Sequence, residues 1–176
     1  MARLKPLPEV WLVSDARNDA ALEAALKRLP RGSGLIFRHY HLAPVQRRAR
    51  FGALAQLARA RGHLVALAGS RAMARRWGAD LSYGPGGDLA PVHSLREIAA
   101  AKRARAILLS AAFATRTHSS AKPLGPLRFR LLAMRAAVPV IALGGMNART
   151  ARRLGWFHWA GIDAFIDTPT THPRSS

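Results

Sequence analysis

Short apolar runs alternate along the chain with longer segments in which Ala, Leu and Arg recur at helical spacing. Such alternation is typical of βα units that build a parallel sheet, whose strands are buried on both faces and are therefore almost wholly apolar. The runs predict strands at Glu9–Val13, Leu35–Arg38, His63–Ala68, Ala79–Tyr83, Leu89–Val92, Ala106–Ser110, Val138–Leu143 and Gly161–Ile166.

The segments between the runs carry helix start signals. Asn18 or Asp19 is expected to cap the first helix, and Pro44 to open the second, long one. Ser94 followed three residues later by Glu97 is a capping box. Asn147 is expected to cap a helix that ends at Leu154.

Eight candidate strands separated mostly by helices predict a single α/β domain over residues 1–176, a (β/α)8 barrel. A doubly wound open sheet is the alternative. The barrel normally takes about 200 residues or more, so this chain has to be trimmed. No helix fits between the fourth and fifth strands, and few residues follow the eighth.

Composition narrows the class of protein. The chain is 49% hydrophobic and has no cysteine, which excludes disulfides, thiolate catalysis and cysteine-ligated metals. No run approaches the roughly 18 apolar residues of a membrane-spanning helix, so no membrane partner is expected. The first residues lack the apolar stretch of a secretory signal, which makes the cytoplasm the expected compartment.

The net charge is +19, from 28 Lys and Arg against nine Asp and Glu. Such an excess commonly indicates a polyanion partner. Here the basic residues are almost all arginine and are scattered from end to end, without a tail or block. A solvated arginine-rich surface is the favoured interpretation, and a nucleic-acid partner is not.

Barrel sites lie at the carboxyl ends of the strands, so the residues just after each apolar run are the candidates. Arg38 and Tyr40 would share one side of the second strand end, and a buried arginine there needs an anionic partner. His39 and His41 would share the other side, and they suggest a metal chelate for which a third ligand is not visible. Asp15, after the first run, is a candidate acid or a helix cap.

Two further features point to an anion. Gly144-Gly145 lies between an apolar run and a helix cap, where backbone N–H groups can close on a phosphate. Simple turn chemistry explains the same pair. The loop 111–125 is long and carries hydroxyl and basic side chains, which favours an active-site lid over a plain surface loop. The cluster 156–159 (WFHW) is more typical of a core or a subunit contact than of a stacking platform.

Several of these segments resemble one family. Arg38 after the second strand, VHSLRE (92–97), AILLSAAFATRTH (106–118), PLG (123–125) and PVIALGGM (139–146) follow the order of the thiamine phosphate synthases and the related thiazole tautomerases. The similarity is strongest from about residue 92 to 150.

The resemblance implies a (β/α)8 barrel of thiamine biosynthesis. Such an enzyme couples a pyrimidine diphosphate to a thiazole phosphate and releases pyrophosphate with Mg²⁺, mainly through positioning and electrostatics. Arg38 would hold the diphosphate, and His118 would replace a loop lysine, as the two catalytic residues. Thr115 and Thr117 would lie at the thiazole phosphate loop, and Gly145 would present its N–H to phosphate. Arg38 and three further residues at strand ends, Tyr40, His93 and Gly144, complete the candidate substrate- and phosphate-binding residues. At the position of Tyr40 the family has a basic residue.

The sequence also departs from the family pattern. The family's asparagine and metal-binding aspartate after the third strand fall on Ala68 and about Ala72, so that Asp88 is the remaining candidate for magnesium. A tautomerase histidine corresponds to Ala111, which argues against that activity.

Three functions follow: a synthase, a non-catalytic binder of thiamine phosphate or phosphate that has lost the metal site, and a basic polyanion-binding protein. A homodimer is expected because a missing eighth helix would leave apolar strand surface uncovered.

Overall fold

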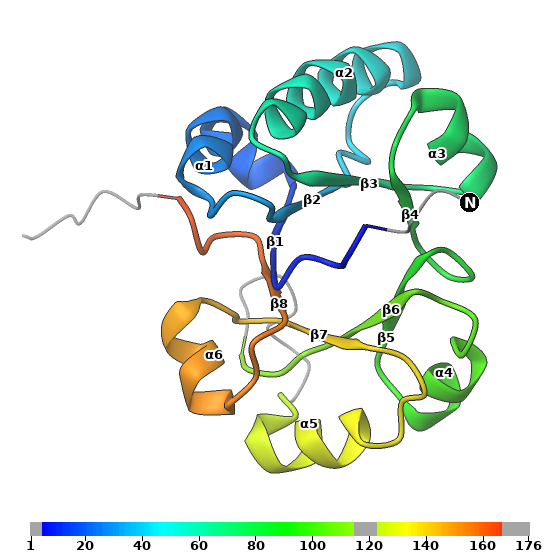
Figure 1. Cartoon of the computed structure of the whole chain (residues 1–176), viewed down its shortest axis with the longest axis vertical. Helices are drawn as coiled ribbons and strands as arrows, with labels where there is room; N and C mark the ends of the chain where they lie inside the picture. The colour runs from blue at the N-terminus through cyan, green and yellow to red at the C-terminus, as the bar shows by residue number, and fades with distance from the viewer. Residues whose placement is uncertain (1–4, 115–122, 167–176) are drawn as a thin grey trace, which may run out of the picture.

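The computed structural model describes residues 5–114 and 123–166, and its strands close into a parallel barrel in chain order (Figure 1). The strands are β1 (Val10–Val13), β2 (Gly34–Phe37), β3 (Leu64–Ala68), β4 (Leu81–Tyr83), β5 (Leu89–Val92), β6 (Ala106–Leu109), β7 (Val140–Leu143) and β8 (Trp159–Gly161). The predicted trimmed (β/α)8 barrel is confirmed, and the open sheet is wrong, because β8 pairs with β1.

Helices follow most strands on the outside of the barrel. They are a 3-10 helix η1 (Ala16–Ala21), α1 (Leu22–Arg28), α2 (Pro44–Ala60), α3 (Arg71–Trp77), α4 (Leu95–Ala100), α5 (Gly125–Ala133) and α6 (Ala148–Leu154). In the described part of the chain, each helix is too short or too polar to serve as a transmembrane span.

The helix ends follow the local signals in the sequence. Pro44 opens α2, and the Ser94 hydroxyl accepts from the Glu97 N–H. Asn147 caps α6 in a capping box. The cap predicted at Asn18 or Asp19 is wrong, because the chain turns into η1 earlier and Asp15 is the cap.

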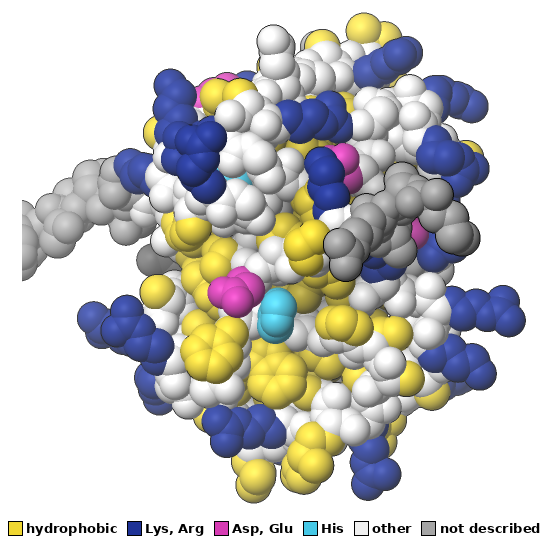
Figure 2. Space-filling view, viewed as in Figure 1, with side chains coloured by type: hydrophobic (Ala, Val, Ile, Leu, Met, Phe, Trp, Pro, Cys, Tyr) yellow, Lys and Arg dark blue, Asp and Glu magenta, His cyan; other side chains and the backbone are white. Residues whose placement is uncertain are grey.

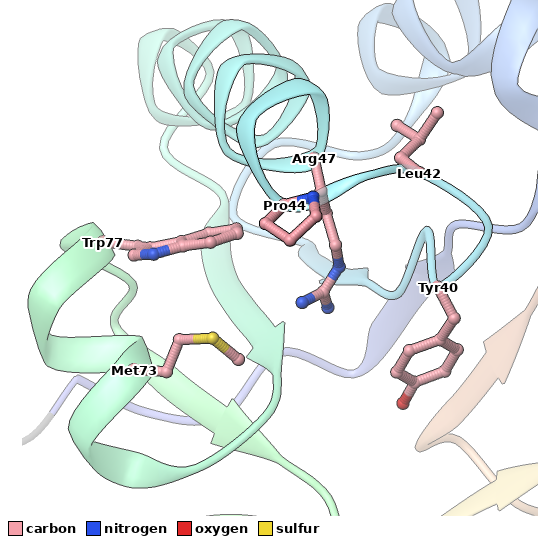
Figure 3. A pocket seen from close by; sticks show the side chains of 6 residues that line it. All are labelled: Tyr40, Leu42, Pro44, Arg47, Met73 and Trp77. Atoms are coloured by element: carbon pink, nitrogen blue, oxygen red, sulfur yellow. The ribbon is translucent and has the colours of Figure 1, made fainter.

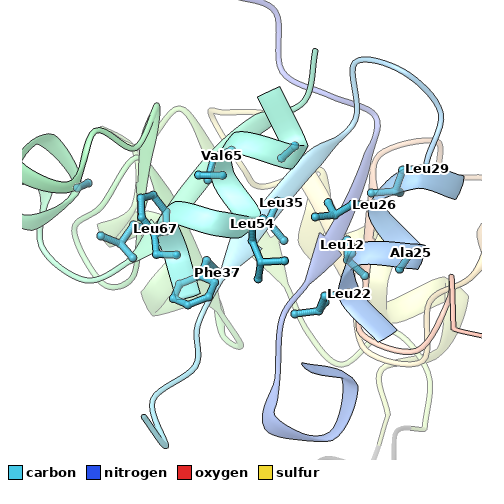
Figure 4. Close-up of a cluster of buried hydrophobic side chains, with 14 residues drawn as sticks. Leu12, Leu22, Ala25, Leu26, Leu29, Leu35, Phe37, Leu54, Val65 and Leu67 are labelled. Atoms are coloured by element: carbon cyan, nitrogen blue, oxygen red, sulfur yellow. The ribbon is translucent and has the colours of Figure 1, made fainter. Parts of the chain in front are cut away.

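Apolar residues fill three regions. Inside the barrel, Trp11, Ile36, Leu108 and their neighbours form one cluster. A second lies between β1–β3 and the helices α1 to α3 (Figure 4), and a third between β5–β8 and α4 to α6. The strands are therefore buried on both faces, which explains why their sequences read as continuous apolar runs.

The barrel is shorter than usual at the places that the sequence indicated. Residues 84–88 connect β4 directly to β5 with no helix, and the two strands pair only through Tyr83 and Leu89. The predicted eighth strand is displaced: β8 begins at Trp159, two residues before the expected start. Trp159 donates its N–H to the Glu9 carbonyl, and that pairing with β1 fixes the register.

Residues 162–166 take over part of the cover that an eighth helix would give. The Phe165 ring stacks on Trp159 with centroids 5.5 Å apart, and Trp159 is only 6% exposed. Phe165 also packs against both outer clusters. The chain itself thus covers part of the surface that motivated the homodimer, and the homodimer stays a prediction.

The basic side chains are spread over the surface. Figure 2 shows one face with lysine and arginine around its edge and apolar side chains at its centre. The charge on this face does not form a stripe, in agreement with the scatter in the sequence.

Candidate functional site

Because all strands are parallel, the residues after them meet at one end of the barrel. Arg38 and Tyr40 follow β2, His93 follows β5, and Gly144 and Gly145 follow β7. The predicted site residues Thr115, Thr117 and His118 lie outside the described residues.

Arg38 is held at this end by an acid. Its Nη2 lies 2.6 Å from Asp15 Oδ2, and the side chains are 19% and 18% exposed. Asp15 also accepts from Arg17. Burial pushes the pKa of Asp15 upward, but the bonds and charges of Arg17 and Arg38 outweigh it and leave the pKa lowered. The anionic partner expected for Arg38 is therefore, at least in part, the protein's own Asp15.

One donor of Arg38 remains unused. Its Nε is buried and has no hydrogen-bond partner among the described residues. A buried donor left unpaired costs free energy. A turn of the side chain that exposes this donor to a ligand oxygen would remove that cost, so the arginine still has capacity for an anion.

Tyr83 is a site residue that sequence reasoning missed. It ends β4, is 7% exposed, and burial raises the pKa of its hydroxyl, while nearby Arg38 opposes the shift. The only signal in the sequence was its position as the last residue of a short apolar run. Tyr83 therefore places a neutral phenol next to the Arg38 guanidinium.

His39 does not form the suggested metal chelate with His41. The strand ends at Phe37, and His39 adopts a positive φ of 40°, so strand alternation no longer applies. Its Nδ1 lies 2.8 Å from Ser14 Oγ, and its Nε2 lies 2.6 Å from Asp19 Oδ1. Both ring nitrogens are thus used inside the protein.

The Ser14–His39–Asp19 chain supports Arg38 rather than offering a nucleophile. Ser14 is fully buried, and its hydroxyl accepts the Arg38 backbone N–H at 2.8 Å. Asp19 in turn binds Arg50, which also pairs with Glu23. The network fixes the backbone from which the Arg38 side chain extends.

The buried histidines predict an acid-sensitive stability. Burial lowers the pKa of His39 and of His63, and bonds to Asp19 and to the Leu26 carbonyl only partly oppose it. The unfolded chain therefore takes up these protons first as the pH falls below about 6.5. We expect the free energy of unfolding, measured in urea, to decrease from pH 7 to pH 5. The slope should be smaller in a His39→Gln/His63→Gln variant, and equal slopes would contradict the assignment.

Tyr40 and His93 lie on the rim and are open to solvent. Tyr40 is 67% exposed. His93 has its imidazole 3.4 Å from Glu97, which also accepts the His93 backbone N–H. Both can reach a ligand without displacing a core contact.

Gly144 and Gly145 close against the loop that follows β6. Both have positive φ, 93° and 62°. A Cβ on Gly144 would lie 2.8 Å from Ala111, and one on Gly145 would lie 2.5 Å from the Ala114 carbonyl oxygen. The glycines are therefore explained by this close approach, whether or not a phosphate binds there.

Gly145→Ala is expected to destabilise the fold by about 1–3 kcal/mol, because both the positive φ and the contact with Ala114 oppose a side chain. Thermal or urea unfolding measures the loss. Gly52→Ala is the matched control: no atom lies within 4 Å of its added Cβ, and alanine in the middle of α2 should stabilise by about 0.5–1 kcal/mol. Equal effects at the two positions would contradict the argument.

The described residues do not fit magnesium. The Asp88 carboxylate accepts from the Ser82 N–H and hydroxyl at 2.9 and 2.7 Å and pairs with Arg71. Over residues 5–114 and 123–166, no group of three His, Asp or Glu side chains is placed to share an ion. Oxygen ligands are what magnesium requires, and Ala68 and Ala72 offer no side-chain oxygen.

Comparisons with known proteins agree with this fold. The model of the thiamine monophosphate synthase family matches residues 89–164. A thiamine phosphate pyrophosphorylase from Pyrococcus furiosus superposes with a TM-score of 0.73 at 22% identity, covering 89% of this chain and 86% of that one. A structure titled native KDPGal gives a TM-score of 0.58 at 14% identity, over 98% and 89% of the two chains. No curated protein gives a significant match.

These findings confirm the resemblance drawn from the sequence. The family match spans β5 to β8, and the structural similarity, at 22% identity, extends the fold over 89% of the chain. The chain thus combines the fold of the thiamine phosphate synthases with a mouth that lacks a magnesium ligand set in its described part.

Proposed function

Because the half of the barrel from residue 89 to 164 matches the thiamine monophosphate synthase family, we propose that this chain binds thiamine phosphate or its phosphorylated precursors at the carboxyl end of the barrel. In this proposal it acts as a homologue of the synthases without their metal centre. The ligands are small phosphorylated molecules, and neither a membrane nor a nucleic acid takes part.

The observation that carries the proposal is the state of Arg38. Its guanidinium is half-buried, is held by Asp15, and keeps a buried Nε without a partner in the described part of the chain. Arginine presents several donors in a fixed plane, which suits phosphate. Asp15 orients that plane, and the Ser14 hydroxyl holds the backbone behind it.

The remaining rim residues would select the rest of the ligand. Tyr83 can donate its phenolic proton to a phosphate oxygen beside Arg38, because burial raises its pKa and keeps it neutral. Tyr40 offers an exposed ring on which a pyrimidine or thiazole could stack. Gly144 and Gly145 would supply backbone N–H groups on the opposite side of the mouth, where they approach Ala111 and Ala114.

The synthase reaction is the second candidate, favoured by the family match over the segment that includes the loop 111–125. It would join hydroxymethylpyrimidine diphosphate to thiazole phosphate and release pyrophosphate. In that reaction Arg38 would stabilise the negative charge of the leaving pyrophosphate. His118 would be the second catalytic residue. The absence of a fitting magnesium site among the described residues weighs against this candidate.

One experiment separates the two. Thiamine phosphate and each precursor are titrated into the protein by calorimetry, and product is measured as thiochrome fluorescence with and without Mg²⁺. Saturable binding without product is the expected result. Product that depends on the protein would establish the synthase, and no binding at millimolar ligand by the folded protein would reject both.

A further inference from the structure

A cavity lies outside the mouth, in the groove between the first turn of α2 and one side of α3. Its inner part, about 260 Å³, is lined by Tyr40, Leu42, Pro44, Arg47, Met73 and Trp77 (Figure 3). An outer part of about 530 Å³ shares three of these residues and adds Arg48, Ser70 and Arg76 among others. The two parts together have the size of a small-molecule site.

Arg47 forms the centre of this groove. Its Nε donates to the Arg38 carbonyl at 2.9 Å and its Nη2 to the Ala68 carbonyl at 2.6 Å. The guanidinium lies 5.5 Å from the ring centroids of both Tyr40 and Trp77. Burial lowers the pKa of Arg47, with Tyr40 opposing. Two of its nitrogens thus hold it in place, and donors remain for a ligand.

The groove contains cations but no acid. None of the residues lining either part is Asp or Glu. In the described residues, the ion pairs found involve other arginines and leave Arg47, Arg48 and Arg76 without a carboxylate partner. The first turns of α2 and α3 contain no acidic residue either. Three arginines in one groove repel one another, and a multiply charged anion would relieve that repulsion.

We propose that this groove binds a planar aromatic ring that carries a phosphate, as a second site that adjoins the mouth of the barrel at Tyr40. The ring would lie in the inner part against Met73 and Trp77, where sulfur and aromatic contacts suit a flat surface. The phosphate would lie in the outer part, within reach of Arg48, Arg76 and the Ser70 hydroxyl. This site goes beyond the function proposed above, since the Arg38 side chain turns to Asp15, and only its backbone carbonyl contacts Arg47.

Adenosine monophosphate is the probe, titrated into the full chain by calorimetry, with adenosine and inorganic phosphate as partial ligands. We expect saturable binding that is at least about tenfold tighter than that of either fragment, because the ring and the phosphate each contribute contacts. Arg76→Glu should weaken it by at least about tenfold. Arg75→Glu is the matched control, since it makes the same charge change on α3 but does not line the cavity.

Three results would overturn the site. Equal losses in Arg76→Glu and Arg75→Glu would mean that only net charge matters. A single-stranded oligonucleotide that binds far more tightly than the mononucleotide and responds equally to both variants would indicate a nucleic-acid surface instead. Loss of binding in Arg38→Ala, with the fold intact by circular dichroism, would put the probe in the mouth. If Arg38→Ala retains the probe, failure of thiamine phosphate to bind leaves the groove site standing.

Discussion

Gly34→Ala is expected to destabilise the barrel by about 3 kcal/mol or more, among the largest effects of any single methyl group in this chain. Gly34 begins β2 and pairs with Trp11 of β1. A Cβ at Gly34 would lie 2.1 Å from Trp11 Cε3 and 2.4 Å from Cδ2. The indole is fully buried and donates its Nε1–H to the Pro8 carbonyl at 3.0 Å. The ring therefore has little room to move away.

The measurement is urea or thermal unfolding, with an expected drop in Tm of about 6–12 °C for a domain of this size. A double-mutant cycle with Trp11→Ala isolates the cause. Trp11→Ala alone should cost about 3–5 kcal/mol through the cavity it leaves. In that background Gly34→Ala should cost much less than it does alone. Additive losses would show that the steric contact with the indole is not the reason.

The strands were predictable because both of their faces are buried. In β5, with the sequence LAPV, prediction and structure coincide. The error at β8 has a physical cause: the apolar run 164–166 resembles a strand, but Phe165 packs on the outside of the barrel, against Trp159. A pattern of apolar residues does not distinguish the inside of a barrel from its cover.

The site was less predictable, because its geometry depends on one unusual backbone angle. Alternation along a strand placed Arg38 with Tyr40 and His39 with His41, but the positive φ of His39 ends that alternation. His39 thereby turns to Ser14 and Asp19, two residues from other elements. Pairing across such distances in sequence leaves no local signal, which is also why Asp15 was not assigned as the partner of Arg38.

The ion pair between Arg38 and Asp15 explains why the sequence alone suggested that Arg38 requires an anionic substrate. A cation at a barrel mouth requires an anion, and without a structure the ligand is the natural choice. Asp15 is the cap of η1 and supplies the charge from within the chain. What remains for a ligand is the buried Nε rather than the whole charge of the side chain.

Arg38→Ala is therefore expected to weaken binding of thiamine phosphate or its precursors by about 100-fold, and to abolish any turnover. Removing one member of a buried charge pair between a protein and its ligand commonly costs 2–5 kcal/mol in binding, because the other charge is left unpaired, roughly 30- to 4,000-fold in affinity. In this variant the Asp15 carboxylate would face the ligand with only Arg17 to neutralise it, and would repel a phosphate. Calorimetric titration with each ligand measures the loss.

Two variants make this result specific to the mouth. Arg105→Ala removes one positive charge at the other end of the barrel, where the guanidinium binds the Lys5 carbonyl, and should leave the affinity within about twofold because exposed charges at that distance are screened. Arg38→Lys keeps the charge but loses the planar arrangement of donors, so its affinity should lie between those of the wild type and Arg38→Ala. If Arg105→Ala weakens binding as much as Arg38→Ala, the +19 charge of the chain attracts the ligand and the mouth does not recognise it. If Arg38→Ala binds as tightly as the wild type, the buried Nε is not the anion-binding donor and the proposed site is wrong.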